Sequence, residues 1–188
     1  MHPNDALGAA PAYILVVEDC AEQRVLLCHI LKKNKYRVHA TGNAQEAILK
    51  ISEEKPCMII SDVDMPEMDG LEFCRAIKGD AALNHIPVVL LTAFWGVKSF
   101  LRGLEAGADY YFMKPMDSKL LLSRTAKILD THPVPMAEDD GIANLIYHFE
   151  GEKHAIPHSR GQILKMLISS HEIAIGQNQK ILKDKLNP

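Results

Sequence analysis

Four short apolar runs of this sequence each end in side chains that can do chemistry. Glu18 and Asp19 follow the first run, Asp62 follows the third, and Thr92 and Lys114 follow the last two. Carboxylates held within a few ångströms of one another repel, which raises the pKa of at least one of them unless a cation lies among them. Mg²⁺, which binds oxygen ligands and retains several waters, suits such a cluster. These residue types therefore indicate a magnesium site, provided that the fold brings them together.

A carboxylate beside Mg²⁺ can also form an aspartyl-phosphate. In that chemistry Asp62 is the nucleophile, and the Thr92 hydroxyl and the Lys114 ammonium take the phosphoryl oxygens. Each residue alone has a plainer interpretation. Glu18 and Asp19 could be acids that stabilise a helix start, Lys114 a solvated lysine and Thr92 a strand-end cap. Their common position at the ends of apolar runs favours the chemical interpretation.

Five apolar runs alternate with five helical patterns between residues 13 and 130. The runs cover residues 13–17, 37–40, 57–61, 88–91 and 110–113. Runs of this kind are typical of strands buried on both faces of a parallel sheet. The helical patterns cover residues 21–33, 44–52, 71–78, 97–105 and 118–129, with Gly, Asn or Pro at the breaks. The alternation predicts an α/β fold with a doubly wound, five-stranded parallel sheet. Ligands of such sheets bind outside the carboxyl ends of the strands, where the reactive side chains should gather.

Four stretches of this region match a known motif set in order and spacing. They are ILVVED at residues 14–19, SDVDMPEMDG at 61–70, LTA at 91–93 and GADYYFMKP at 107–115. With these stretches, residues 13–130 resemble the receiver domain of response regulators in two-component signalling. The resemblance implies a flavodoxin-like sheet with strand order 2-1-3-4-5. It also implies a phosphorelay module that receives its phosphoryl group from a sensor histidine kinase or phosphotransfer protein and catalyses only its own phosphorylation and dephosphorylation.

The resemblance also assigns roles within the pocket. Asp62 is the phosphoacceptor, Thr92 and Lys114 bind the phosphoryl group, and Thr92 and Tyr111 form the switch. The Lys114–Pro115 peptide bond is expected to be cis. The implied Mg²⁺ ligands are the side chains of Glu18, Asp19 and Asp62 and the backbone carbonyl of Asp64.

Two residues near the pocket are expected to tune it, because these positions vary within the family. Asp64 adds a fourth acid, and Phe94 is bulky. Our hypothesis is that Phe94 obstructs an attacking water and Asp64 alters its orientation. The lifetime of the phosphoryl bond would then differ from that of receivers with small neutral residues there.

The chain is expected to divide into five parts. These are a flexible N-terminus (1–12), the receiver domain (13–130), a linker (131–143) with two prolines and an acidic cluster, a β-hairpin (144–157) and a long helix (158–188). Apolar and polar residues recur along the helix at spacings of four and three, which predicts a short coiled-coil seam and a homodimer. The alternative is an amphipathic helix folded back on its own receiver. The seam consists of Leu164, Ile168, His171, Ile175, Asn178 and Leu182.

Composition and charge narrow the function further. The 21 basic and 24 acidic side chains give a net charge of −3, and neither the part up to residue 130 (15 basic, 17 acidic) nor the rest (6 and 7) has the basic excess of a nucleic-acid-binding module. No apolar run approaches the roughly 18 residues that span a bilayer, so we expect a cytoplasmic protein without direct DNA or membrane binding.

Three alternative functions remain open. The segment from Leu145 to Leu182 resembles connectors that precede PAS or histidine-kinase modules, so the chain could be the receiver region of a larger hybrid kinase. The Asp62-Val63-Asp64 motif also fits a small phosphatase of the haloacid-dehalogenase type, although in those enzymes the other metal-binding acids follow the lysine. A scaffold that works without phosphate is the third alternative.

Overall fold

A five-stranded parallel sheet forms the centre of the computed structural model, which describes residues 12–93, 96–115, 117–131, 144–149 and 152–157. Its strand order is β2-β1-β3-β4-β5, so the flavodoxin-like order predicted from the sequence is confirmed. All neighbouring strands run parallel and pair in continuous register, as Val17 with Ser61 and Asp62 with Leu91 illustrate. The strands are β1 (Tyr13–Val17), β2 (Arg37–Thr41), β3 (Met58–Asp62), β4 (Val88–Thr92) and β5 (Tyr110–Met113).

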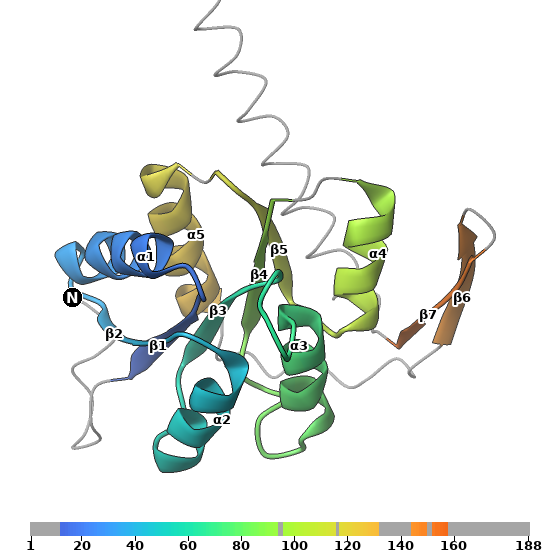
Figure 1. Cartoon of the computed structure of the whole chain (residues 1–188), viewed down its shortest axis with the longest axis horizontal. Helices are drawn as coiled ribbons and strands as arrows, with labels where there is room; N and C mark the ends of the chain where they lie inside the picture. The colour runs from blue at the N-terminus through green and yellow to red at the C-terminus, as the bar shows by residue number, and fades with distance from the viewer. Residues whose placement is uncertain (1–11, 94–95, 116, 132–143, 150–151, 158–188) are drawn as a thin grey trace, which may run out of the picture.

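Helices cover both faces of this sheet (Figure 1). The helices are α1 (Ala21–Lys33), α2 (Ala44–Glu53), α3 (Gly70–Gly79), α4 (Val97–Glu105) and α5 (Ser118–Thr131). Apolar residues of α2, α3 and α4 share one core with alternate strand residues such as Leu15 and Leu90. Residues of α1 and α5 share a second core with the residues between them, such as Val16 and Leu91. Burial on both faces explains why the strands are continuous apolar runs rather than alternating ones.

The predicted boundaries agree with the structure to within two residues. The largest difference is at the end of α5, expected at residue 129 and found at Thr131, and the difference that concerns the site is at β3, which was expected at 57–61 and lies at Met58–Asp62. Asp62 extends the strand because its backbone continues the pairing with Leu91 of β4. The acidic side chain is thus held by the sheet itself.

The first residue of helix α3 packs directly against the backbone at the end of β3. The Gly70 amide donates to the Val63 carbonyl at 2.9 Å. A Cβ on Gly70 would lie 2.0 Å from the Asp62 carbonyl oxygen and 2.9 Å from the Val63 Cα. Only glycine allows this close approach of two backbones, so it positions the segment that follows Asp62.

A capping box begins the same helix. The Glu72 amide donates to Asp69 Oδ1 at 2.7 Å, and the Asp69 amide donates to Glu72 Oε2 at 3.1 Å. Both amides lie among those that a helix start leaves without an intrahelical partner.

We therefore expect Asp69→Ala to lower the free energy of unfolding by about 1 kcal/mol, because an N-cap oxygen is lost. Urea denaturation of the full chain measures this change. Asp69→Ser keeps a capping oxygen and is the control, so its loss of stability should be no more than half of the loss in Asp69→Ala. Equal losses in both variants would show that the cap contributes nothing.

Two further strands follow the receiver region. Strands β6 (Asn144–Phe149) and β7 (Glu152–Pro157) pair antiparallel as a hairpin, and β7 contacts α4, beside which it lies in Figure 1. In the part of the chain that the structure describes, no helix is long and apolar enough to cross a bilayer. Residues 1–11, residues 132–143 of the predicted linker and the long helix with its seam lie outside the described residues, whereas Thr131, predicted as the first residue of the linker, ends α5.

Candidate functional site

Three carboxylates meet at the carboxyl end of the sheet. One carboxylate oxygen each from Glu18, Asp19 and Asp62 can be chosen so that all lie within 4.8 Å of one another. Pairing of Val17 with Ser61 sets the ends of β1 and β3 side by side, which brings Glu18 next to Asp62. Glu18 and Asp62 are buried, whereas Asp19 is exposed. The sheet therefore gathers the acids that the sequence predicted to meet.

Lys114 lies between the two buried carboxylates. It follows β5, and its Nζ is 2.8 Å from Glu18 Oε2 and 2.9 Å from Asp62 Oδ1. Its backbone amide donates to the Thr92 carbonyl at 2.7 Å, and the peptide bond to Pro115 is cis, as predicted. The lysine reaches across the end of β4 to join side chains from β1 and β3.

Burial and charge oppose each other in this cluster. Burial raises the pKa of Glu18, the Lys114 hydrogen bond opposes this, and the charge of Asp62 adds to it. Burial alone would lower the pKa of Lys114, but its hydrogen bonds to Glu18 and Asp62 raise it above its ordinary value. Lys114 is therefore a firmly protonated cation among acids.

The donor set fits a hard divalent cation. Glu18 Oε1 is fully buried and has no hydrogen-bond partner among the described residues, although buried polar atoms are nearly always paired. With Asp19 and Asp62 beside it, the cluster offers only oxygen ligands, which Mg²⁺ and Ca²⁺ prefer.

Thr92 and Tyr111 lie together next to the acids. Both side chains are buried, and the Thr92 and Ser99 side chains hydrogen-bond with the Tyr111 phenol. Burial raises the pKa of Tyr111. The rings of Tyr111 and Phe100 meet edge to face, with centroids 6.3 Å apart at 87°. Tyr111 thus connects the end of β4 to α4.

The tuning residues differ in what the structure describes. Asp64 is exposed in the segment between β3 and α3, and its slight desolvation there, together with the charge of Asp62, raises its pKa. Phe94 lies outside the described residues, so its predicted position is not tested.

Sequence reasoning missed three supporting residues. Arg24 donates to the backbone carbonyls of Glu18 and Asp19 and so holds the acid segment from α1. Arg102 of α4 lies 3.7 Å from Asp69, and Ser99 bonds Tyr111. Arg24 could have been found from its spacing, because it follows Asp19 by five residues and so lies in the first turns of α1, next to the acid pair. The other two contacts depend on how α4 packs, for which the sequence carries no signal.

Removal of the Lys114 charge should destabilise the acid cluster. We expect Lys114→Gln to lower the free energy of unfolding in metal-free buffer by about 1–2 kcal/mol, less than the roughly 3–5 of a fully buried pair because the lysine is partly exposed. Addition of Mg²⁺ should raise Tm more in this variant than in the wild type, since the cation replaces the lost charge. Lys50→Gln, which breaks a pair with the exposed Glu53, is the control and should change stability by less than about 0.5 kcal/mol. An equal Mg²⁺ effect on both variants would contradict the expectation.

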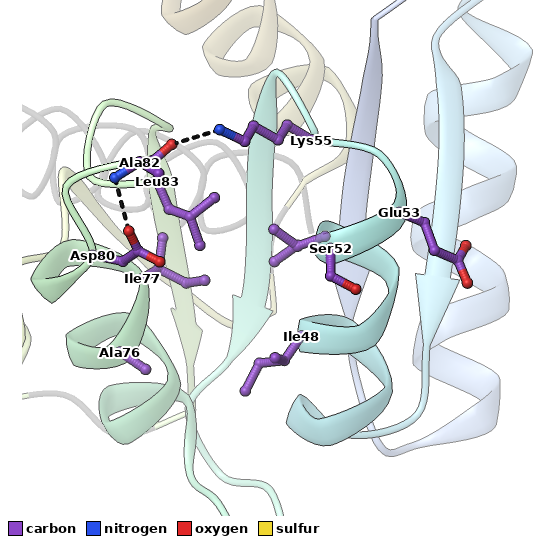
Figure 2. A pocket seen from close by; sticks show the side chains of 10 residues that line it. Ile48, Ser52, Glu53, Lys55, Ala76, Ile77, Asp80, Ala82 and Leu83 are labelled. Carbon is purple, nitrogen blue, oxygen red and sulfur yellow. Dashed lines mark hydrogen bonds between the residues drawn. The ribbon is translucent and has the colours of Figure 1, made fainter.

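A hollow of about 490 Å³ lies between α2 and α3 (Figure 2). Apolar side chains such as Ile48, Ile77 and Leu83 line it, and Lys55 at its rim donates to the Ala82 carbonyl at 3.0 Å. None of the acidic cluster lines it, so the hollow is separate from the acidic site.

A 2-1-3-4-5 parallel sheet with acids, a threonine and a lysine at its carboxyl edge defines a doubly wound protein of the receiver class. The chain belongs to the response regulator receiver domain family, whose model matches residues 14–126. It is thus a receiver domain protein of two-component signalling, and the domains of this family are signalling modules.

Relatives share the receiver region and extend beyond this chain. Histidine kinase P4 of Formosa agariphila is 42% identical over 117 residues, which are 62% of this chain and 8% of that protein. The phosphate regulon transcriptional regulatory protein PhoB of Klebsiella pneumoniae is 36% identical over 129 residues, 69% of this chain and 56% of that protein. The chain therefore matches only part of the length of either relative.

Solved structures agree with the fold. The receiver domain of a signal transduction histidine kinase from Syntrophus aciditrophicus has a TM-score of 0.61 and 39% identity, covering 68% of this chain and 99% of that one. The chemotaxis protein CheY4 of Vibrio cholerae has a TM-score of 0.60 and 29% identity, covering 63% and 99%.

Proposed function

We propose that this chain is a phosphorylation-switched receiver that accepts a phosphoryl group on Asp62 from a sensor histidine kinase or phosphotransfer protein. The observation that carries the proposal is the group of three carboxylates within 4.8 Å, two of which Lys114 joins. A purely structural cluster of acids would not need a buried Glu18 oxygen that has no hydrogen-bond partner in the described part of the chain.

The chemistry follows from the position of each group. An oxygen of Asp62 attacks the phosphorus of phosphohistidine, and the N–P bond breaks with its electron pair going to the imidazole, which takes a proton. Lys114 is placed to hold one phosphoryl oxygen and Thr92 another. Glu18, Asp19, Asp62 and the backbone carbonyl of Asp64 would hold Mg²⁺, which would supply positive charge to the phosphoryl oxygens. The chain acts on its own side chain only.

Three results with the full chain test this function. In the presence of Mg²⁺ and acetyl phosphate, the protein should gain the mass of one phosphoryl group, and EDTA should prevent the gain. Turnover of a phosphomonoester without mass gain would instead identify a phosphatase. Neither reaction would identify a scaffold.

Asp64 and Phe94 remain the proposed tuning residues for loss of the phosphoryl group. Asp64 is exposed near Asp62, where its charge can reach a water that approaches the phosphoryl group. We expect Asp64→Asn and Phe94→Ala each to change the dephosphorylation rate several-fold, because water orientation and access change. The decay of phosphorylated protein after removal of the donor measures this rate. If the phosphorylated protein decays at the wild-type rate in both variants, the tuning hypothesis is wrong.

The output is proposed to be protein contact in the cytoplasm, with self-association through residues 158–188. A second candidate is the receiver region of a larger hybrid kinase, which the match to 8% of a histidine kinase favours. Size-exclusion chromatography before and after phosphorylation tests self-association of the chain.

A further inference from the structure

The β6–β7 hairpin lies on the helix that connects most directly to the candidate phosphoacceptor pocket. Strand β7 contacts α4, and Figure 1 shows the hairpin beside that helix and away from α1 and α5. A two-stranded hairpin is marginally stable on its own in water. Among the described elements, the contact with α4 is therefore expected to stabilise the hairpin.

Tyr111 connects α4 to the pocket. Its phenol bonds Thr92, at the end of β4, and Ser99, on α4, while its ring packs against Phe100 of α4. Thr92 is buried and follows Leu91, which pairs with Asp62. Tyr111 thus contacts both Thr92, at the end of β4 beside Asp62, and α4, the helix that β7 contacts.

Arg102 gives α4 a second connection. Its guanidinium lies 3.7 Å from Asp69, which caps α3 after the segment that follows Asp62. The charges of Arg102 and Asp62 both act on Asp64 in that segment. We expect added negative charge on Asp62 to attract the Arg102 guanidinium, which already lies near Asp69 at the start of α3.

We propose that the β6–β7 hairpin is a latch on α4 whose docking is coupled to the pocket through Tyr111 and Arg102. The part that concerns phosphorylation rests on the proposed function. In the switch that the receiver resemblance implies, the Thr92 hydroxyl turns to a phosphoryl oxygen and leaves Tyr111. What we add is that α4 then loses a contact and the hairpin docked on it is released. Because coupling between two sites is reciprocal, release of the hairpin also loosens α4.

Hydrogen exchange of the full, unphosphorylated chain tests the latch without any phosphoryl chemistry. In the wild type, the amides of residues 152–156 of β7 should be protected. Tyr111→Phe keeps the ring and loses both hydroxyl bonds, and it should speed exchange of residues 144–157 about fivefold. Ser99→Ala should have a smaller effect in the same direction. Ser52→Ala is the matched control, because Ser52 is an exposed serine of α2 that bonds only its own helix in the structure, and it should change nothing.

The reverse experiment perturbs the hairpin. His154 pairs with Tyr147 in the middle of the hairpin, and His154→Pro should break that pairing because proline cannot donate to the ladder. Exchange of residues 97–105 of α4 should then rise about fivefold, while exchange of α1 stays as in the wild type.

The outcomes separate the latch from the receiver function. Unprotected amides at 152–156 in the wild type, or equal exchange of 144–157 in the wild type and Tyr111→Phe, would overturn the latch. Unchanged α4 exchange in His154→Pro would do the same. Coupled exchange in a chain that acetyl phosphate fails to modify would support the latch and refute the proposed phosphorylation.

Discussion

Asp62→Asn is expected to abolish phosphoryl uptake from acetyl phosphate, with no phosphorylated species in the mass spectrum. The amide keeps the shape of the side chain but is not a nucleophile toward phosphorus. The Lys114 ammonium still has Glu18 at 2.8 Å, so the pocket retains one of its two ion pairs. The loss should therefore be chemical, with the fold intact by circular dichroism.

Asp64→Asn is the matched control for this experiment. It removes a carboxylate two residues away whose side chain is exposed, so the protein should still gain one phosphoryl group. Uptake by Asp62→Asn at the rate of the wild type would show that another residue is the acceptor. Loss of uptake in both variants would point to a general requirement for acidic charge.

Gly70→Ala is expected to cost about 3 kcal/mol of unfolding free energy. The added methyl group would lie 2.0 Å from the Asp62 carbonyl oxygen, and this neighbour is backbone, so helix and strand must separate. Overpacking of this kind costs roughly 1–3 kcal/mol or more. The displacement begins at Asp62 itself, so phosphoryl uptake should slow as well.

Gly79→Ala provides the comparison within the same helix. A Cβ there meets no atom within 4 Å, and alanine has the better helix propensity, so the variant should equal or exceed the wild type in stability by up to about 1 kcal/mol. Chemical denaturation of both variants measures the difference. Similar losses at the two positions would mean that the close contact with β3 is not what requires glycine at position 70.

The sheet and the acidic cluster were predictable because their signals are local. A run such as residues 88–91 is apolar throughout only when both faces are covered, and the carboxyl ends of parallel strands gather by topology. This is why Glu18, Asp62 and Lys114 could be brought together from positions almost a hundred residues apart. The end of β3 was missed by one residue because an acid is a poor strand signal, while pairing with Leu91 holds it in the sheet.

The contacts around α4 could not be predicted in this way. Ser99 and Arg102 are ordinary helix-surface types, and their partners Tyr111 and Asp69 depend on how that helix lies on the sheet. The contact of β7 with α4 is likewise tertiary. Local patterns specify which face a helix buries but not which neighbour its remaining side chains touch.

The position of Lys114 has a consequence for how a metal ion enters and leaves. Its ammonium serves as a built-in counter-ion for Glu18 Oε2 and Asp62 Oδ1, so the acids can fold together without an external cation. An incoming ion must then share these oxygens with a charge that is already in place, which lowers its net gain in free energy. We therefore expect weak binding with rapid exchange, so that occupancy follows the free Mg²⁺ concentration instead of being fixed when the protein folds.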